Sequence, residues 1–96
     1  MITTHKLVTG EEVVGNSFEE TNTITISKPR TFQIIQDSAG NVRAGLVPWF
    51  LSDPEVEVTI SKTHILASAE TTVQLQEAYL KQTSSLELPS SKIFVN

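Results

Sequence analysis

The stretch KLVTGEEVVGNSF, residues 6–18, decides how the first part of the chain folds. Gly10, Gly15 and Ser17 in it have the spacing of the phosphate-binding loop G-x-x-x-x-G-K-[ST]. The lysine of that loop is replaced by Asn16, and two glutamates follow Gly10 where phosphate groups would lie. The pattern after the loop continues as a strand, so no helix N-terminus would offer its amides to an anion. We therefore interpret the two glycines as parts of a bent β-strand.

The length and composition predict one domain, spanning residues 1–96. A chain this short buries a modest fraction of its surface, so joining other copies would add to its stability. With 39% hydrophobic and 19% charged residues it is typical of a soluble domain. It has no cysteine, no apolar run long enough for a membrane span and no signal peptide. These features predict an intracellular, cytoplasmic protein with no membrane partner.

The charge balance argues against a protein that binds nucleic acid mainly through phosphates. Seven basic and eleven acidic residues give a net charge of −4, the opposite sign to that of most such proteins. The basic residues are scattered, and only Lys28 and Arg30 lie close together. A small local binding site remains compatible with this distribution.

The first three-quarters of the chain has the composition of β-strands separated by turns. The cleanest signal is EVEVTISKTHI, in which Val56, Val58 and Ile60 alternate with polar residues and so face one side. Pro48 interrupts the preceding apolar run, which indicates an edge strand or a bulge. The predicted strands cover residues 5–9, 11–18, 23–28, 32–36, 42–51 and 55–65.

After Ala69 the pattern changes to that of a helix, predicted over about residues 71–86. Thr71 and Gln74 have the spacing of a capping box. The helix carries apolar residues on two sides, which predicts two partners: the sheet of its own chain and a neighbouring chain. One stripe holds Leu75, Ala78, Tyr79 and Leu86, and the other side holds Val73 and Leu80. The remaining tail, residues 87–96, contains a short apolar run after Pro89.

The glycine stretch also resembles a known family. Leu7, Gly10, Val13 and Gly15 follow the pattern L-x-x-G-x-x-φ-x-G that opens the first Sm motif of the Sm-like family, which includes the Sm, LSm and Hfq proteins. Ile24 and Ile26 fall where that family has apolar strand residues, and VTISKTHILAS, residues 58–68, resembles the second Sm motif. The resemblance covers roughly residues 6–66 and is strongest to the small Sm-like proteins of tailed phages.

This resemblance implies a mainly β fold: a strongly bent five-stranded antiparallel sheet, forming a small open barrel over about residues 5–68. The C-terminal helix predicted from the residue pattern departs from the family, since Sm proteins begin with a helix, but it could cover the same open end of the barrel. Glycine suits both fold-defining positions, the turn at Gly10 and the bend at Gly15, because it has no Cβ. The resemblance further implies a homo-oligomeric ring of about five to seven copies, in which the fourth strand of one copy pairs with the fifth of the next. Trp49 and Phe50 would then divide between core and interface. A phage protein of this kind would act in the host cytoplasm.

The resemblance also indicates where RNA would bind. Lys62 occupies the position of the lysine in the Tyr-Lys-His turn of Hfq proteins. His64 and Asn22 are further RNA-binding candidates, and Asn22, in the loop before residues 23–28, also fits ordinary turn chemistry. The family's RNA loop has no counterpart here, because the corresponding positions are Thr21, Thr23 and Thr25 and offer no aromatic ring for stacking on a base. Lys62 also fits an ordinary solvated turn lysine, and His64 a partly buried, hydrogen-bonded residue.

Two functions therefore stay open: a ring that binds RNA or nucleotides at the inner turn, and an oligomeric protein-interaction scaffold without nucleic-acid binding. A different small barrel of the SH3-like kind is a third possibility. The sequence does not indicate an enzyme, since it lacks a cysteine nucleophile and the G-x-S-x-G and H-E-x-x-H motifs. No cofactor and no metal site are predicted, because His5 and His64 are far apart in the sequence.

Overall fold

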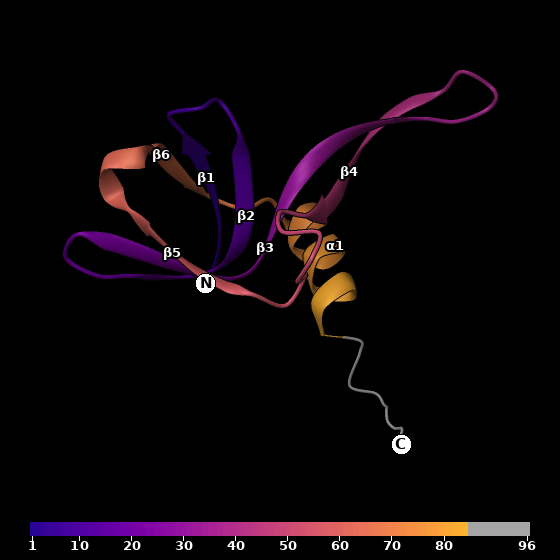
Figure 1. Cartoon of the computed structure of the whole chain (residues 1–96). Coiled ribbons are helices and arrows are strands. Elements are labelled where there is room, and N and C mark those ends of the chain that lie inside the picture. Colours follow the sequence, from indigo (N-terminus) through magenta and orange to yellow (C-terminus); the bar gives the residue numbers. More distant parts are fainter. Residues whose placement is uncertain (85–96) are drawn as a thin grey trace.

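Six strands, a single turn of 3-10 helix and one α-helix follow one another along residues 1–84, the part of the chain that the computed structural model describes (Figure 1). In chain order they are β1 (Ile2–Leu7), β2 (Glu12–Glu19), β3 (Thr23–Gln36), β4 (Val42–Pro48), β5 (Glu57–Ser61), the 3-10 turn η1 (Lys62–His64), β6 (Ile65–Glu70) and α1 (Val73–Thr83). The prediction of a mainly β fold with a helix after the strands is confirmed for this part of the chain.

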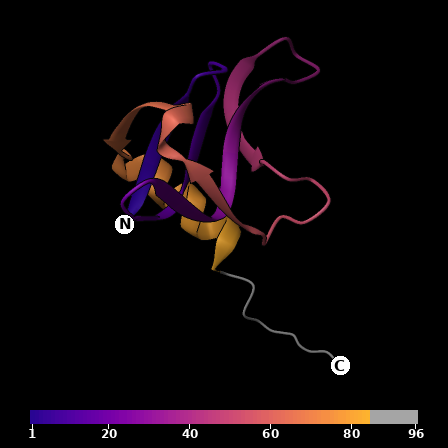
Figure 2. The ribbon, with the colours of Figure 1, turned by 60° about the vertical axis from the view of Figure 1, so that its left-hand side comes forward.

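All strand pairs are antiparallel, in the order β4-β3-β2-β1-β6, and β5 also pairs with β3. The sheet curls so that β5 and β6 approach each other and are joined by η1, as the two views show (Figures 1 and 2). In residues 1–84, β6 pairs with β1 and not with β5, so the sheet is curled but not closed. It therefore has outer edges along β6 on one side and along β4 and β5 on the other.

The two glycines of the opening stretch lie where the sequence predicts. Gly10 has φ +95° in the turn between β1 and β2, a conformation that favours glycine. Gly15 lies at a register shift between β2 and β3, located between Val14 and Asn16. A Cβ at Gly15 would collide with the Ile26 side chain and lie 3.0 Å from the Ser27 carbonyl oxygen. Glycine at this position lets two strands cross closely at the bend.

The long strand β3 corrects the predicted strand count. The two strands expected at residues 23–28 and 32–36 are one strand that changes partner: Thr23–Ser27 pairs with β5, and Arg30–Gln36 pairs with β4. Between the two parts, Lys28 adopts φ 49°, which marks the point at which the strand changes partner. The stretch expected as one strand over 55–65 is divided by η1 into β5 and the start of β6, so the sheet has six strands, whereas the resemblance implies five. The run predicted to extend to Leu51 ends as a strand at Pro48, and β1 begins at Ile2, earlier than expected.

We call residues 28–30 the β3 corner. The guanidinium of Arg30 is buried there and donates from Nε to Gln82 Oε1 (2.9 Å) and from a terminal nitrogen to the Pro54 carbonyl oxygen (2.8 Å). Lys28 Nζ donates to the Thr83 carbonyl oxygen at the end of α1 (3.0 Å), a favourable place for a cation near a helix C-terminus. The two neighbouring basic residues thus bind α1 and the 49–56 loop to the sheet.

We call the curled part of the sheet the barrel, although it is not closed. Beyond the corner, β3 and β4 leave it as a two-stranded ribbon, residues 31–47, which projects away from the other strands (Figure 1). Its tip is a turn in which Asp37 Oδ1 accepts from the Ala39 and Asn41 amides, both at 2.9 Å. One face of the ribbon is apolar, because the opposed pairs Phe32–Leu46 and Ile34–Ala44 place their side chains on the same side.

The core lies inside the curled part of the sheet and is built from alternate strand residues. Its buried members are Leu7, Val13, Ile24 and Ile26, with Trp49, Val58, Ile60 and Ile65 packed against them. The predicted inward side of the stretch from Val56 to Ile60 is confirmed. Trp49 packs on the core, whereas Phe50 is exposed and meets the Trp49 ring edge-on at 5.4 Å.

Helix α1 is shorter than the predicted 71–86, and the capping box is wrong. The capping box would make Thr71 the N-cap, but the N-cap is Thr72, and its side chain makes no cap bond. The hydroxyl of Thr71 contacts the hydroxyl of Thr4 at 2.9 Å. The two predicted sides are confirmed: Tyr79 is buried, while Val73 and Leu80 are exposed. Leu86 and the tail 87–96 lie outside the described residues.

Candidate functional site

The predicted RNA-binding turn is the 3-10 turn η1 between β5 and β6. Ser61 precedes it, and its hydroxyl oxygen accepts from the Thr63 amide at 3.3 Å, which tightens the turn. The Lys62 amide donates to the Asn22 carbonyl oxygen at 2.9 Å. This bond holds the turn against the loop between β2 and β3, so the structure brings together two of the three candidates, Lys62 and Asn22.

The Lys62 ammonium is paired with an acid. Its Nζ lies 2.7 Å from Glu19 Oε2 at the end of β2. The hydrogen bond and the charge of Lys62 lower the pKa of Glu19 below its usual value, so the Glu19 carboxyl is ionised at neutral pH. An anionic ligand at Lys62 would have to compete with this carboxylate.

His64 does not join the other two candidates. Its side chain is exposed, which corrects the expectation that it is partly buried. Its contribution to the turn is its backbone, since the His64 carbonyl oxygen accepts from the Val8 amide at 2.9 Å. The imidazole is therefore presented to solvent at the rim of the turn.

Beside Lys62 lies a hollow of about 290 Å³. It lies along η1 and β6 and combines the Lys62–Glu19 ion pair with an apolar wall and a hydroxyl. Its lining residues are Glu19, Ile24, Lys62, Ile65, Leu66, Ala67 and Ser68. We call it the η1 hollow.

Sequence reasoning missed the group that lies behind this hollow. His5 of β1 is 2% exposed, and both of its ring nitrogens meet serine hydroxyls: Nδ1 lies 2.7 Å from Ser68 Oγ, and Nε2 lies 2.9 Å from Ser17 Oγ. The Ser17 hydroxyl donates to the Gly15 carbonyl oxygen at 3.2 Å, so its oxygen is free to accept from Nε2–H. Nδ1 is then the acceptor for the Ser68 hydroxyl.

Burial lowers the pKa of His5 below its ordinary 6.5, and the charge of Glu19 opposes this only in part. The imidazole is therefore neutral at physiological pH. A signal for this group was present in the sequence: His5 is two residues from Leu7, which places it on the inward face of a strand. An inward histidine needs hydrogen-bond partners.

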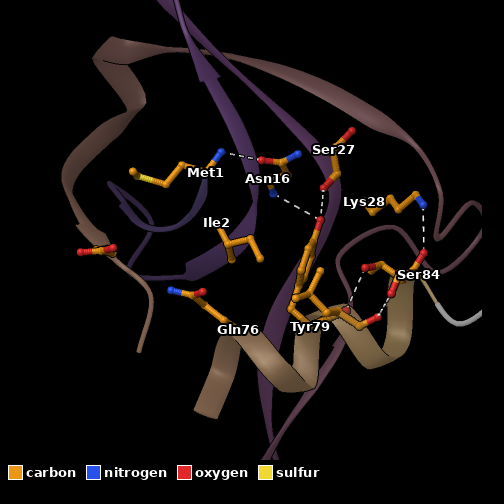
Figure 3. A pocket seen from close by; sticks show the side chains of 11 residues that line it. Met1, Ile2, Asn16, Ser27, Lys28, Gln76, Tyr79 and Ser84 are labelled. Atoms are coloured by element: carbon orange, nitrogen blue, oxygen red, sulfur yellow. Dashed lines mark hydrogen bonds between the residues drawn. The ribbon is translucent and has the colours of Figure 1, made fainter. Parts of the chain in front are cut away.

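A second, larger hollow of about 580 Å³ lies between α1 and the sheet, and Tyr79 stands in it (Figure 3). The Tyr79 hydroxyl donates to the Ser27 carbonyl oxygen at 2.6 Å and accepts from the Asn16 amide at 3.2 Å. Both bonds are to backbone atoms next to Gly15, where the register of β2 against β3 shifts. The hydroxyl therefore fastens the helix to the bend, and we assign it a structural role.

Comparison with protein-family models found no match for this chain, and neither did comparison with curated proteins. Within residues 1–84, no group of histidine and acidic side chains is arranged to hold a metal ion. No helix in the same part of the chain has both the length and the apolar character that crossing a bilayer requires.

Proposed function

We propose that the chain is an Sm-like protein that assembles into a homo-oligomeric ring and serves as a protein-interaction scaffold. The support comes first from the order of the strands. A strand bent at a glycine and a tight turn before the last strand are what the resemblance implies, and the chain has both, at Gly15 and at η1. In this interpretation β4 and β5 together take the place of the fourth strand, and β6 that of the fifth.

The observation that carries the proposal is the pair of sheet edges left without a partner in residues 1–84, along β4 and along β6. An exposed edge invites another strand, and pairing β4 of one copy with β6 of the next would satisfy both edges around a ring. The ribbon that carries β4 is suited to burial, because Asp37 and Arg43 are the only charged residues in 31–47. On its apolar face Ile34 is 69% and Val42 is 62% exposed.

The register defines a variant that blocks this pairing alone. Two backbone bonds show which residue pairs of the β3–β4 ladder are hydrogen-bonded: Asp37 N donates to Asn41 O, and Trp49 N donates to Pro29 O. Because hydrogen-bonded and non-hydrogen-bonded pairs alternate along an antiparallel ladder, the amides of residues 42, 44 and 46 point away from β3. Ala44→Pro removes an outward amide and leaves the bonds to β3 in place. We expect the natural chain to show the mass of about five to seven copies in light scattering, and Ala44→Pro to show a smaller species. A natural chain with the mass of one copy would contradict the proposal.

A second candidate is RNA or nucleotide binding at Lys62, favoured by the bond that places the Lys62 turn against Asn22. A ring would repeat Lys62 in every copy and concentrate its charge. Fluorescence titration with oligo-U and oligo-A at low salt tests it. We expect Lys62→Ala to weaken binding and Glu19→Gln to strengthen it, because the competing carboxylate is lost. Absence of binding to both oligomers would leave only the scaffold function.

A further inference from the structure

The strand β6, whose outer edge the proposed ring would pair with the next copy, also carries a serine hydroxyl that is aimed at a histidine held in one tautomer. Edge pairing would use the backbone groups of β6, whereas its side chains stand roughly perpendicular to the sheet. The hydrogen bonds run in one direction, from Ser68 to His5 Nδ1, from His5 Nε2 to Ser17, and from Ser17 to the Gly15 carbonyl oxygen. The distance of 2.7 Å between Ser68 Oγ and Nδ1 lies within the range of a nucleophile and its base.

The backbone fixes this geometry. His5 and Ser68 face each other across β1 and β6. Thr71 N donates to the Ile2 carbonyl oxygen, so residues 2 and 71 form a hydrogen-bonded pair of this ladder. Hydrogen-bonded and non-hydrogen-bonded pairs alternate, and the His5–Ser68 pair lies three positions further on. It is therefore a non-hydrogen-bonded pair, the type in which opposed side chains lie closest. The two side chains are thus positioned by paired strands and not by a mobile loop.

The serine can be reached from solvent. Ser68 is exposed and lines the η1 hollow, whereas His5 is buried behind it. Ile65 and Leu66 offer an apolar wall, and the Lys62 ammonium lines the same hollow. The Glu19 carboxylate lies 2.7 Å from this ammonium and lines the hollow too. Negative charge developing on a substrate oxygen would therefore share the Lys62 cation with Glu19. The volume of about 290 Å³ suits a small acyl group.

We propose that Ser68 is a nucleophile that accepts acyl groups from small activated esters, with His5 as its general base. Ser68 Oγ bonds to the carbonyl carbon while its proton moves to His5 Nδ1. The bond from that carbon to the leaving oxygen then breaks, and His5 returns the proton to the departing alcohol. Water repeats the same two steps on the acyl-serine, which releases the carboxylic acid and restores both side chains. No oxidant, metal or cofactor is required.

A fluorophosphonate probe tests the nucleophile on the full-length chain. Ser68 displaces fluoride from phosphorus, and mass spectrometry identifies the labelled residue. We expect label on Ser68, none on Ser68→Ala, and a rate at least about tenfold lower in His5→Gln, since a general base contributes at least that much. Ser17→Ala should label several-fold more slowly because His5 loses its orienting acceptor. Ser38→Ala, in the distant ribbon turn, serves as the matched control and should label at the natural rate.

The pH profile is a second readout, independent of whether His5→Gln folds. The labelling rate of the natural chain should rise with pH as His5 loses its proton and level off below the ordinary histidine pKa of about 6.5. Release of nitrophenolate from p-nitrophenyl acetate should follow the same curve. A chain that carries no label on Ser68, a flat profile between about pH 5 and pH 8, or equal rates in folded His5→Gln would overturn the proposal. Light scattering on the same samples reports assembly separately, so the two proposals can fail independently.

Discussion

The two halves of β3 make a direct comparison, because one strand with similar residues lies in two different environments. In the barrel half, Ile26 is fully buried between β2 and β5; in the ribbon half, Ile34 is 69% exposed. Both residues are isoleucines on a well-paired strand. The difference shows that pairing alone does not bury a side chain: a second layer of residues must lie over it, and in the ribbon a two-stranded unit has none.

The largest effect should come from truncating the same side chain in each half. Ile26→Ala removes core atoms and should lower the free energy of unfolding by about 2–5 kcal/mol. Ile34→Ala should change it by at most about 0.5 kcal/mol, as for an exposed position. Urea denaturation at one low protein concentration measures both. Similar losses at the two positions would mean that the ribbon is covered in the folded chain, and repeating the experiment at high concentration would show whether another copy covers it.

A glycine next to each half of β3 provides the next comparison: Gly15 in β2 and Gly40 in the turn between β3 and β4. Gly15→Ala forces a methyl group against Ile26 and the Ser27 carbonyl oxygen, and should cost about 1–3 kcal/mol through overpacking. Gly40 in the ribbon turn has open space around it but φ +87°, so Gly40→Ala should cost only about 1 kcal/mol of backbone strain. Thermal and urea unfolding measure both changes. Equal costs would indicate that the bend at Gly15 can open to admit a side chain.

The barrel half should also respond to mild acid. Burial favours neutral His5 in the folded chain, so the unfolded chain takes up a proton first, at the ordinary pKa of 6.5. The contribution of His5 to the free energy of unfolding should therefore be fully present above that pH. Below it, the free energy of unfolding should fall by at most about 1.4 kcal/mol per pH unit, until the pH has passed the lower pKa of His5 in the folded chain. His5→Gln should lose this dependence. Urea midpoints between pH 5 and 8 that are equal in the natural chain would contradict the burial argument.

The smallest effect belongs to the ribbon turn. The Asn41 amide, with further help from Ala39 and Gly40, lowers the pKa of the Asp37 carboxyl below its usual 3.8. The stabilisation is present above that value and is lost as the pH falls through the lower folded pKa. An NMR titration of the Asp37 carboxyl should show the lowered midpoint, and Asp37→Ala should leave the urea midpoint of the barrel unchanged. A midpoint at or above 3.8 would mean that the turn is not formed in solution.

Local patterns predicted a good part of this fold. Gly10 and Gly15 could be interpreted because a turn and a strand bend each require a residue without a Cβ. The inward side of β5 and the two sides of α1 followed from the periods of the strand and the helix. The strand count could not be obtained in this way, because Lys28-Pro29 has the composition of a break and only the pairing with β4 and β5 shows the strand to be continuous.

The candidate site was predicted only where its residues are neighbours in the sequence. Lys62 and His64 belong to one turn, but the turn separates them, since one side chain points to Glu19 and the other to solvent. Glu19 is 43 positions from Lys62, and Ser68 is 63 positions from His5. Contacts over such separations depend on strand register, which a single sequence does not specify. For the same reason Thr71 was mistaken for a cap when its hydroxyl is used by Thr4.

The β3 corner bears on how many copies a ring can contain. The strands β4 and β5 are separate and are joined by the 49–56 loop, and Gln82 of α1 donates to the Leu46 carbonyl oxygen of the ribbon at 3.0 Å. Closing a ring of five turns each copy by about 72° relative to the last, and a ring of seven by about 51°. In the proposed ring, the bond from the buried Arg30 guanidinium to Gln82 would help to fix the angle between ribbon and neighbour, and so the number of copies.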